Sequence, residues 1–182
     1  MSDFNFYFDQ LTSHAPELVP QGVGDPALSR QLNSADLFDG RSGPIVDCCR
    51  AGLLLWNDDL DGAHPLIQDL PDQTAAFWHA ILHRREGDYG NARYWWARTG
   101  DHPAFEPILD LVLHRVPDFP FIDELRAEGR WLPLEWNAAC QNFARDGRYE
   151  SELRATQRLE MRGLLEWCAA RVRAHKSASP SS

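Results

Sequence analysis

The chain has 182 residues, of which 43% are hydrophobic and 25% charged, and it carries a formal net charge of −9. This length and composition are typical of one globular domain that buries a sizeable core. The acidic balance argues against a nucleic-acid partner, because phosphate binding requires a basic face. No run of about 18 apolar residues occurs, so the sequence predicts no membrane partner either.

The N-terminal segment, residues 1–25, contains two prolines and two glycines between positions 16 and 24. These residues predict an irregular lead-in whose aromatic side chains lie across the body of the domain (Phe4, Phe6, Tyr7 and Phe8). The segment has neither the basic stretch nor the apolar stretch of a secretory signal. At the other end, the sequence HKSASPSS predicts a disordered tail over residues 175–182.

Residues 26–174 are predicted to form a single compact, all-α domain, because their apolar residues recur with helical spacing and strand-like alternation is scarce. Asp25-Pro26 opens a weak helix to about Phe38, and Gly43-Pro44 starts a helix that ends at Asn57. The later helices are predicted over 60–70 with an interruption at Pro65, 73–86 with Asp72 as N-cap, 89–99 before Gly100, 104–116, 121–129, 133–146 and 149–174. The last and longest helix packs either on its own domain or on a second copy of the chain.

An internal similarity relates residues 57–67 to residues 86–96 at an offset of 29, and residues 145–153 form a looser third copy. Equivalent positions in the first two copies carry an aspartate, an apolar residue and a small alanine (Asp59 and Asp88, Leu60 and Tyr89, Ala63 and Ala92). This pattern predicts tight helical hairpins in which the alanine lets two helices approach closely. It resembles the hairpin of tetratricopeptide and Sel1-type repeats, which implies repeat-like hairpins within the compact domain.

Four cysteines, Cys48, Cys49, Cys140 and Cys168, form no CxxC pair and no regular framework. The sequence therefore predicts reduced, buried thiols in a cytoplasmic protein, although a redox or metal role is the alternative.

The densest cluster of polar and aromatic residues is the segment FWHAILHRREGDYGNARYWWARTGDHP, residues 77–103. On a helix, His79, His83 and Glu86 fall on one face, and two histidines four residues apart can bind one metal ion. His64 or His102 can complete such a site if the hairpins stack, and the sequence leaves the metal open. The alternative is structural: HAILH lacks the general base of HExxH, and Arg84 and Arg85 would repel a cation.

The arginines of the same segment also have two interpretations. In one, Arg84, Arg85 and Arg93 form salt links with Glu86 and Asp88 that stabilise the hairpin turn, while arginines stack on tryptophan rings. In the other, Arg85, Arg93 and Arg98 converge on an anionic ligand, because guanidinium groups bind carboxylate and phosphate in bidentate geometry.

The segment resembles a motif of an uncharacterised bacterial and fungal protein family, WHAIxHRRExDxxNAxYWxxRxGxHP, and LDGAHPLIQ belongs to the same resemblance. The similarity covers about residues 55–105. It implies that one family feature contains His79, His83, Arg84, Arg85, Glu86, Asp88, Asn91, Trp95 and His102, and it implies no reaction.

Phosphate-binding loops, dinucleotide fingerprints, nucleophile elbows and cysteine-rich metal boxes are absent from the sequence. We therefore expect a non-enzymatic helical domain that binds a protein or peptide partner, or forms a homodimer. The alternative is a small-molecule or metal site, with or without catalysis, on the His79, His83 and Glu86 face beside the arginine cluster. A third interpretation makes the segment a folding element only.

Overall fold

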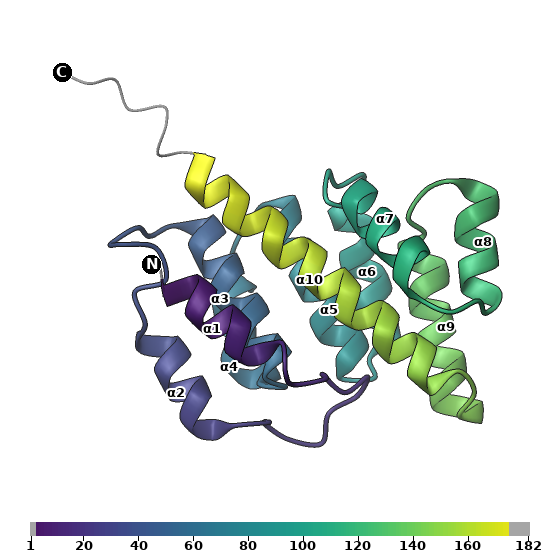
Figure 1. The fold of residues 1–182 in the computed structure, drawn as a ribbon, viewed down its shortest axis with the longest axis horizontal. Helices are drawn as coiled ribbons and strands as arrows, with labels where there is room; N and C mark the ends of the chain where they lie inside the picture. The colour runs from purple at the N-terminus through teal and green to yellow at the C-terminus, as the bar shows by residue number, and fades with distance from the viewer. Residues whose placement is uncertain (1–2, 175–182) are drawn as a thin grey trace.

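The computed structural model describes residues 3–174, which fold into ten α-helices and contain no strand, so the predicted all-α class is confirmed (Figure 1). The helices are α1 (Asp3–Leu11), α2 (Pro26–Ser34), α3 (Pro44–Trp56), α4 (Leu60–Ile67), α5 (Gln73–Arg85), α6 (Tyr89–Thr99), α7 (Phe105–Arg115), α8 (Pro120–Glu128), α9 (Pro133–Asp146) and α10 (Glu150–Ala174). The tail predicted over residues 175–182 lies outside the described residues. None of the helices within 3–174 combines the length and apolarity that a bilayer span requires.

The N-terminal lead-in is not irregular throughout, because α1 occupies its first part and corrects the prediction for residues 1–25. Phe4, Phe8 and Leu11 repeat at helical spacing and are buried, and the Phe8 ring meets the Trp56 ring edge-on at 5.7 Å. The aromatic residues therefore do lie on the domain, with the exception of Phe6, which is 60% exposed. The prolines and glycines that suggested irregular backbone all follow this helix.

Helix α10 runs across the other helices and packs on α3 and α7 (Figure 1). Two glycines, Gly52 of α3 and Gly163 of α10, permit this close packing. A Cβ atom on Gly52 of α3 would lie 2.5 Å from the Trp78 ring and 2.7 Å from Leu165 of α10, and one on Gly163 would lie 2.6 Å from Ile108. The apolar face of the last helix is thus covered by its own domain, as one of the two sequence-based alternatives expected.

The hairpins α3–α4 and α5–α6 turn in the same way. In each, one residue has a left-handed backbone (Asp58 at φ 60°, Gly87 at φ 80°). The aspartate that follows, Asp59 or Asp88, bonds through its backbone N–H to the carbonyl five residues earlier at 2.9 Å. Its carboxylate then caps the next helix by accepting an N–H three residues on. The small residues expected between the helices are fully buried (Ala63 and Ala92). The two turns are equivalent at the 29-residue offset, while the resemblance to tetratricopeptide and Sel1-type repeats stays a prediction.

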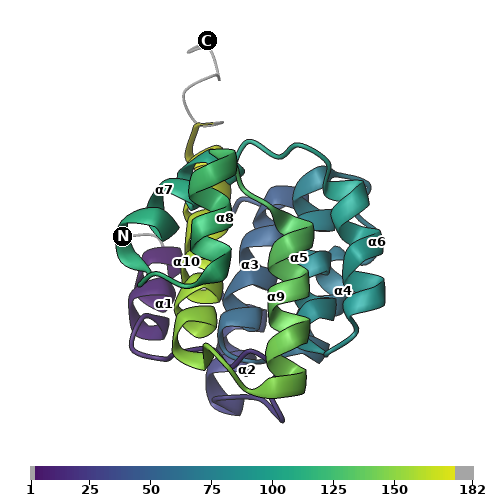
Figure 2. The same cartoon turned by 90° about the vertical axis from the view of Figure 1, so that its right-hand side faces the viewer.

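These hairpins lie side by side, with α4 and α6 both packed against α5 (Figure 2). Helix α5 is consequently covered on all sides, and every residue from Thr74 to Arg85 is buried, including its histidines and arginines. Buried polar side chains on such a helix require partners or a ligand.

The four cysteines are free and buried, which agrees with the prediction of reduced thiols. Burial raises the pKa of the Cys140 thiol to about 12. Thiols of this kind are protonated and unreactive at neutral pH.

Candidate metal centre

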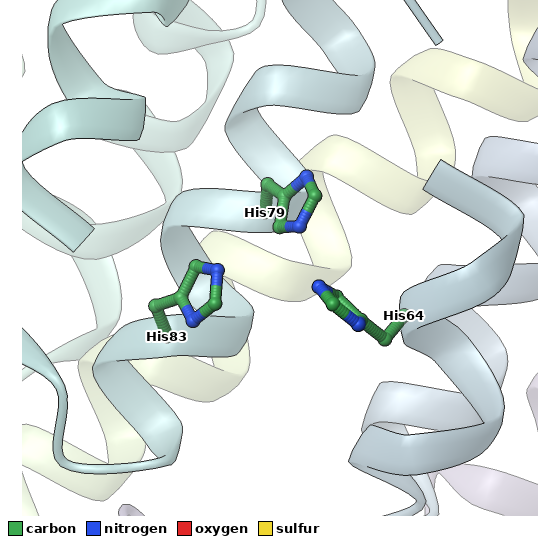
Figure 3. A group of neighbouring side chains, drawn as sticks. All are labelled: His64, His79 and His83. Carbon is green, nitrogen blue, oxygen red and sulfur yellow. The ribbon is translucent and has the colours of Figure 1, made fainter. Parts of the chain in front are cut away.

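Three histidine side chains from two neighbouring helices meet in one place. His79 and His83 are one turn apart on α5, and His64 comes from α4 (Figure 3). One ring nitrogen from each lies within 4.8 Å of the others. The ring centroids are separated by 4.9 Å for His64 and His79, 5.1 Å for His79 and His83, and 5.7 Å for His64 and His83.

Local structure explains this convergence. Spacing of four residues stacks the His79 and His83 rings almost parallel, with an interplanar angle of 10°. The Asp59 cap starts α4 beside α5, and His64 follows within the short helix. His79 is 1% and His83 8% exposed, whereas His64 is only partly buried, so the cluster opens to solvent on the His64 side.

The spacing is close to what a coordinated metal ion requires. With Zn–N bonds of about 2.0–2.1 Å in a tetrahedron, ligand nitrogens lie about 3.3 Å apart. Nitrogens that lie within 4.8 Å of one another need to approach by about 1.5 Å at most to reach that separation. The partly exposed His64 side chain has the freedom to supply part of this movement.

The protonation state of His79 suits a metal ligand. Burial, assisted by the nearby His83 and His64, lowers the pKa of His79 to about 3. The ring is therefore neutral at pH 7, as metal binding requires. The Trp95 ring stacks on it at 3.9 Å, and its buried Nδ1 has no hydrogen-bond partner among residues 3–174. Figure 3 shows the other ring nitrogen directed towards the neighbouring imidazoles.

Hydrogen bonds determine the tautomer of His83. Its Nδ1 lies 2.6 Å from Oε2 of Glu86, so Nδ1–H donates to the carboxylate. The opposite nitrogen, Nε2, accepts the side-chain N–H of Asn91 at 3.2 Å, so a metal ion bound at Nε2 would replace this hydrogen bond. A histidine that binds metal through one nitrogen and donates to a carboxylate through the other has this arrangement.

The structure thus changes the composition of the predicted cluster. Among the described residues, the group able to share one ion is His64, His79 and His83. Glu86, expected in line with the two histidines of α5, instead bonds to the nitrogen of His83 that carries the proton. His102, the alternative to His64, lies elsewhere: it is buried between the Thr74 hydroxyl at 3.2 Å and the Ala104 backbone N–H at 3.1 Å.

Arg84 and Arg85 are structural. Arg84 is 1% exposed and pairs with Glu160 of α10, with Nη1 3.1 Å from Oε1. Arg85 is 0% exposed, pairs with Asp58 and donates to the backbone carbonyl of Glu17. The salt links therefore join distant elements rather than residues of the hairpin turn. Because each guanidinium has its own carboxylate, neither opposes a cation at the histidines.

The remaining predicted residues do not form an anion site. Arg85 is buried and paired with Asp58, while Arg93 and Arg98 are exposed on α6, so Arg85 is not free to bind an anion together with them. The Arg98 guanidinium lies 5.4 Å from the Trp95 ring centroid, which matches the predicted stacking. Asp88 caps α6 by accepting the Asn91 backbone N–H at 3.0 Å.

Sequence reasoning missed the carboxylates that neutralise the two arginines. Asp58 lies 27 residues from Arg85, and Glu160 lies 76 residues from Arg84. No spacing pattern links residues so far apart, and only the packing of α10 and of the α3–α4 turn against α5 brings them together.

Comparisons of the chain with protein-family models, with curated proteins and with solved structures found no match. The chemistry of the site therefore rests on its geometry alone.

Proposed function

We propose that this protein binds a divalent transition metal ion through His64, His79 and His83. The observation that carries the proposal is the convergence of three imidazole nitrogens within 4.8 Å from two helices. The neutral state of His79 and the carboxylate-bound tautomer of His83 both favour metal coordination.

The ligand set favours zinc, copper, nickel or iron over magnesium or calcium. Imidazole nitrogen suits the former ions, whereas magnesium and calcium prefer oxygen ligands. Three histidines fill three positions of a tetrahedral site, so the fourth position takes water or a small ligand. The partly exposed His64 leaves a route from solvent to that position.

A purely structural role explains the histidines less well. Structural histidines normally satisfy their ring nitrogens with carboxylates or carbonyls. His83 does so through Glu86 and Asn91, but no hydrogen bond among the described residues involves a ring nitrogen of His64 or His79. An ion between the three rings would give the facing nitrogens of His64 and His79 a shared partner, whereas the orphaned Nδ1 of His79, which is directed away from the other imidazoles, would stay without one.

The four cysteines support a reducing, cytoplasmic location for this metal site. All of them are buried and unpaired, as is usual for proteins of reducing compartments. None belongs to the three-histidine group.

The test is a zinc titration of metal-free protein in competition with a coloured chelator. We expect one zinc ion to bind per chain. His64→Gln should weaken the zinc affinity by about 100-fold or more, which exceeds the 10–100-fold typical of losing a residue that only hydrogen-bonds a metal ligand. His114→Gln is the matched control, because His114 is exposed on α7 and bonds only a backbone carbonyl of its own helix. Equal zinc affinity in the parent and in His64→Gln would refute the proposal.

A partner-binding face on α6 is the second candidate function. Tyr94 is 55% exposed, and the Arg98 guanidinium lies 5.7 Å from its ring centroid and 5.4 Å from that of Trp95. Tyrosine, tryptophan and arginine are the residues that most often dominate protein interfaces. For a second copy as partner, sedimentation equilibrium should detect a dimer that Tyr94→Ala dissociates. A parent protein that remains monomeric at high concentration would exclude the homodimer.

A further inference from the structure

A pocket of about 350 Å³ is lined by residues of α8, α9 and the start of α10. Helices α8 and α9 lie together at one end of the molecule (Figure 1). The pocket is separate from the three histidines, none of which lines it. Its volume is in the range of small-molecule sites.

Aromatic rings form much of its wall. Phe119 precedes α8, Phe143 belongs to α9, and Tyr149 precedes α10. The rings of Phe119 and Tyr149 are 5.7 Å apart and tilted by 34°. Tyr149 is 43% exposed, so its ring is available to a ligand. Aromatic faces carry negative electrostatic potential and attract cations.

Carboxylates complete the pocket. Glu124 and Glu135 line it, both are exposed, and neither has an ion-pair partner among residues 3–174. The third acidic residue, Asp146, pairs at 2.7 Å with Arg148, a cation that also lines the pocket, so these two charges offset each other. Two uncompensated negative charges beside aromatic walls give the pocket the chemistry that recognises an organic cation.

The backbone of Tyr149 is left-handed. Its φ is 62°, a left-handed conformation that is unfavourable for a bulky side chain and is usually given to glycine. Here the strained backbone holds the phenol ring beside Phe119 in the wall of the pocket.

We propose that this pocket binds a small organic cation of the alkylammonium class, held between the aromatic rings and the carboxylates of Glu124 and Glu135. The proposal is independent of the metal site. A cation with apolar substituents suits both the apolar wall and the negative rim, whereas an anion or a neutral polar molecule suits neither.

The experiment is an amide-resolved NMR titration of the whole chain with two probes. One is choline, and the other is its uncharged tert-butyl analogue, in which carbon replaces the ammonium nitrogen. We expect choline to shift the resonances around Tyr149 and Phe143 saturably, and the uncharged analogue to bind about tenfold more weakly. Equal binding of the two probes, or no saturable binding of choline, would overturn the proposal.

Variants separate recognition from folding. Tyr149→Gly removes the ring and relieves the left-handed strain, so we expect a melting temperature that is unchanged or higher, together with about tenfold weaker choline binding. The double variant Glu124→Gln/Glu135→Gln should weaken binding similarly. Glu106→Gln, which removes an exposed carboxylate of α7 outside this pocket, should leave binding unchanged. An equal loss in Glu106→Gln would assign the effect to net charge and overturn the proposal, as would unchanged binding in Tyr149→Gly.

Discussion

The buried ion pair between Arg84 and Glu160 gives the sharpest stability prediction. Both side chains are at most 1% exposed, and Glu160 also accepts a hydrogen bond from the Trp136 indole at 3.1 Å. Burial lowers the pKa of Arg84, but the charge of Glu160, the neighbouring Cys140, the hydrogen bond to Glu160 and Tyr89 together more than offset this, so the guanidinium stays charged. Glu160→Gln therefore leaves an uncompensated charge in the core.

Breaking a buried pair in this way costs about 3–5 kcal/mol. At about 2–4 °C per kcal/mol for a chain of this size, the melting temperature should fall by about 6–20 °C. The loss is a large part of the 5–15 kcal/mol that stabilises an ordinary domain. Urea unfolding followed by circular dichroism measures it directly.

The matched control lies on the same helix. Glu166 pairs with Arg162 at 2.8 Å, but both are more than one-third exposed, so Glu166→Gln should cost about 0–1 kcal/mol. If Glu160→Gln cost no more than Glu166→Gln, Arg84 would not be held in a buried pair. The arginine would then again be available for ligand binding.

Three further predictions concern the histidines. Glu86→Gln should weaken zinc affinity by about 10–100-fold in chelator competition, because the His83 Nδ1–H loses its carboxylate acceptor; an unchanged affinity would contradict the assigned tautomer. A hundredfold excess of zinc over its dissociation constant should stabilise the fold by about 2.7 kcal/mol and raise the melting temperature by about 5–11 °C in scanning calorimetry, and this shift should be absent in His64→Gln. Burial, with a contribution from Arg171, lowers the pKa of His102 to about 4, so the unfolded chain takes up this proton first as pH falls. The contribution of this lowered pKa to the free energy of unfolding is fully present above about pH 6.5. It falls by about 1.4 kcal/mol per pH unit towards pH 4. Across this pH range, the free energy of unfolding in urea should fall less for His102→Gln than for the parent protein. Equal falls in the two proteins would refute the prediction.

The helices were largely predictable because their signals are local. Asp72 and Gly100 mark helix ends through cap geometry, and both positions are confirmed. The equivalent turns at Asp59 and Asp88 follow from a repeated short pattern. Helix α1 was missed because the prolines and glycines behind it dominated the interpretation of the whole N-terminal segment.

The candidate site was predictable only in part. The spacing of His79 and His83 places both on one helix face, but the sequence left His64 and His102 as equal candidates for the third ligand. Only the packing of α4 against α5 brings His64 to the pair. The role of Glu86 also depends on a side-chain torsion that directs its carboxylate to Nδ1 of His83.

The most direct measurement is a crystal structure of the zinc-loaded protein with data collected above and below the zinc absorption edge. We expect one strong anomalous peak between α4 and α5, about 2.0–2.1 Å from one ring nitrogen of each of His64, His79 and His83, with a water in the fourth position. A zinc-bound crystal in which this position has no peak, and the ion instead lies on surface carboxylates or at His114, would contradict the proposed metal site.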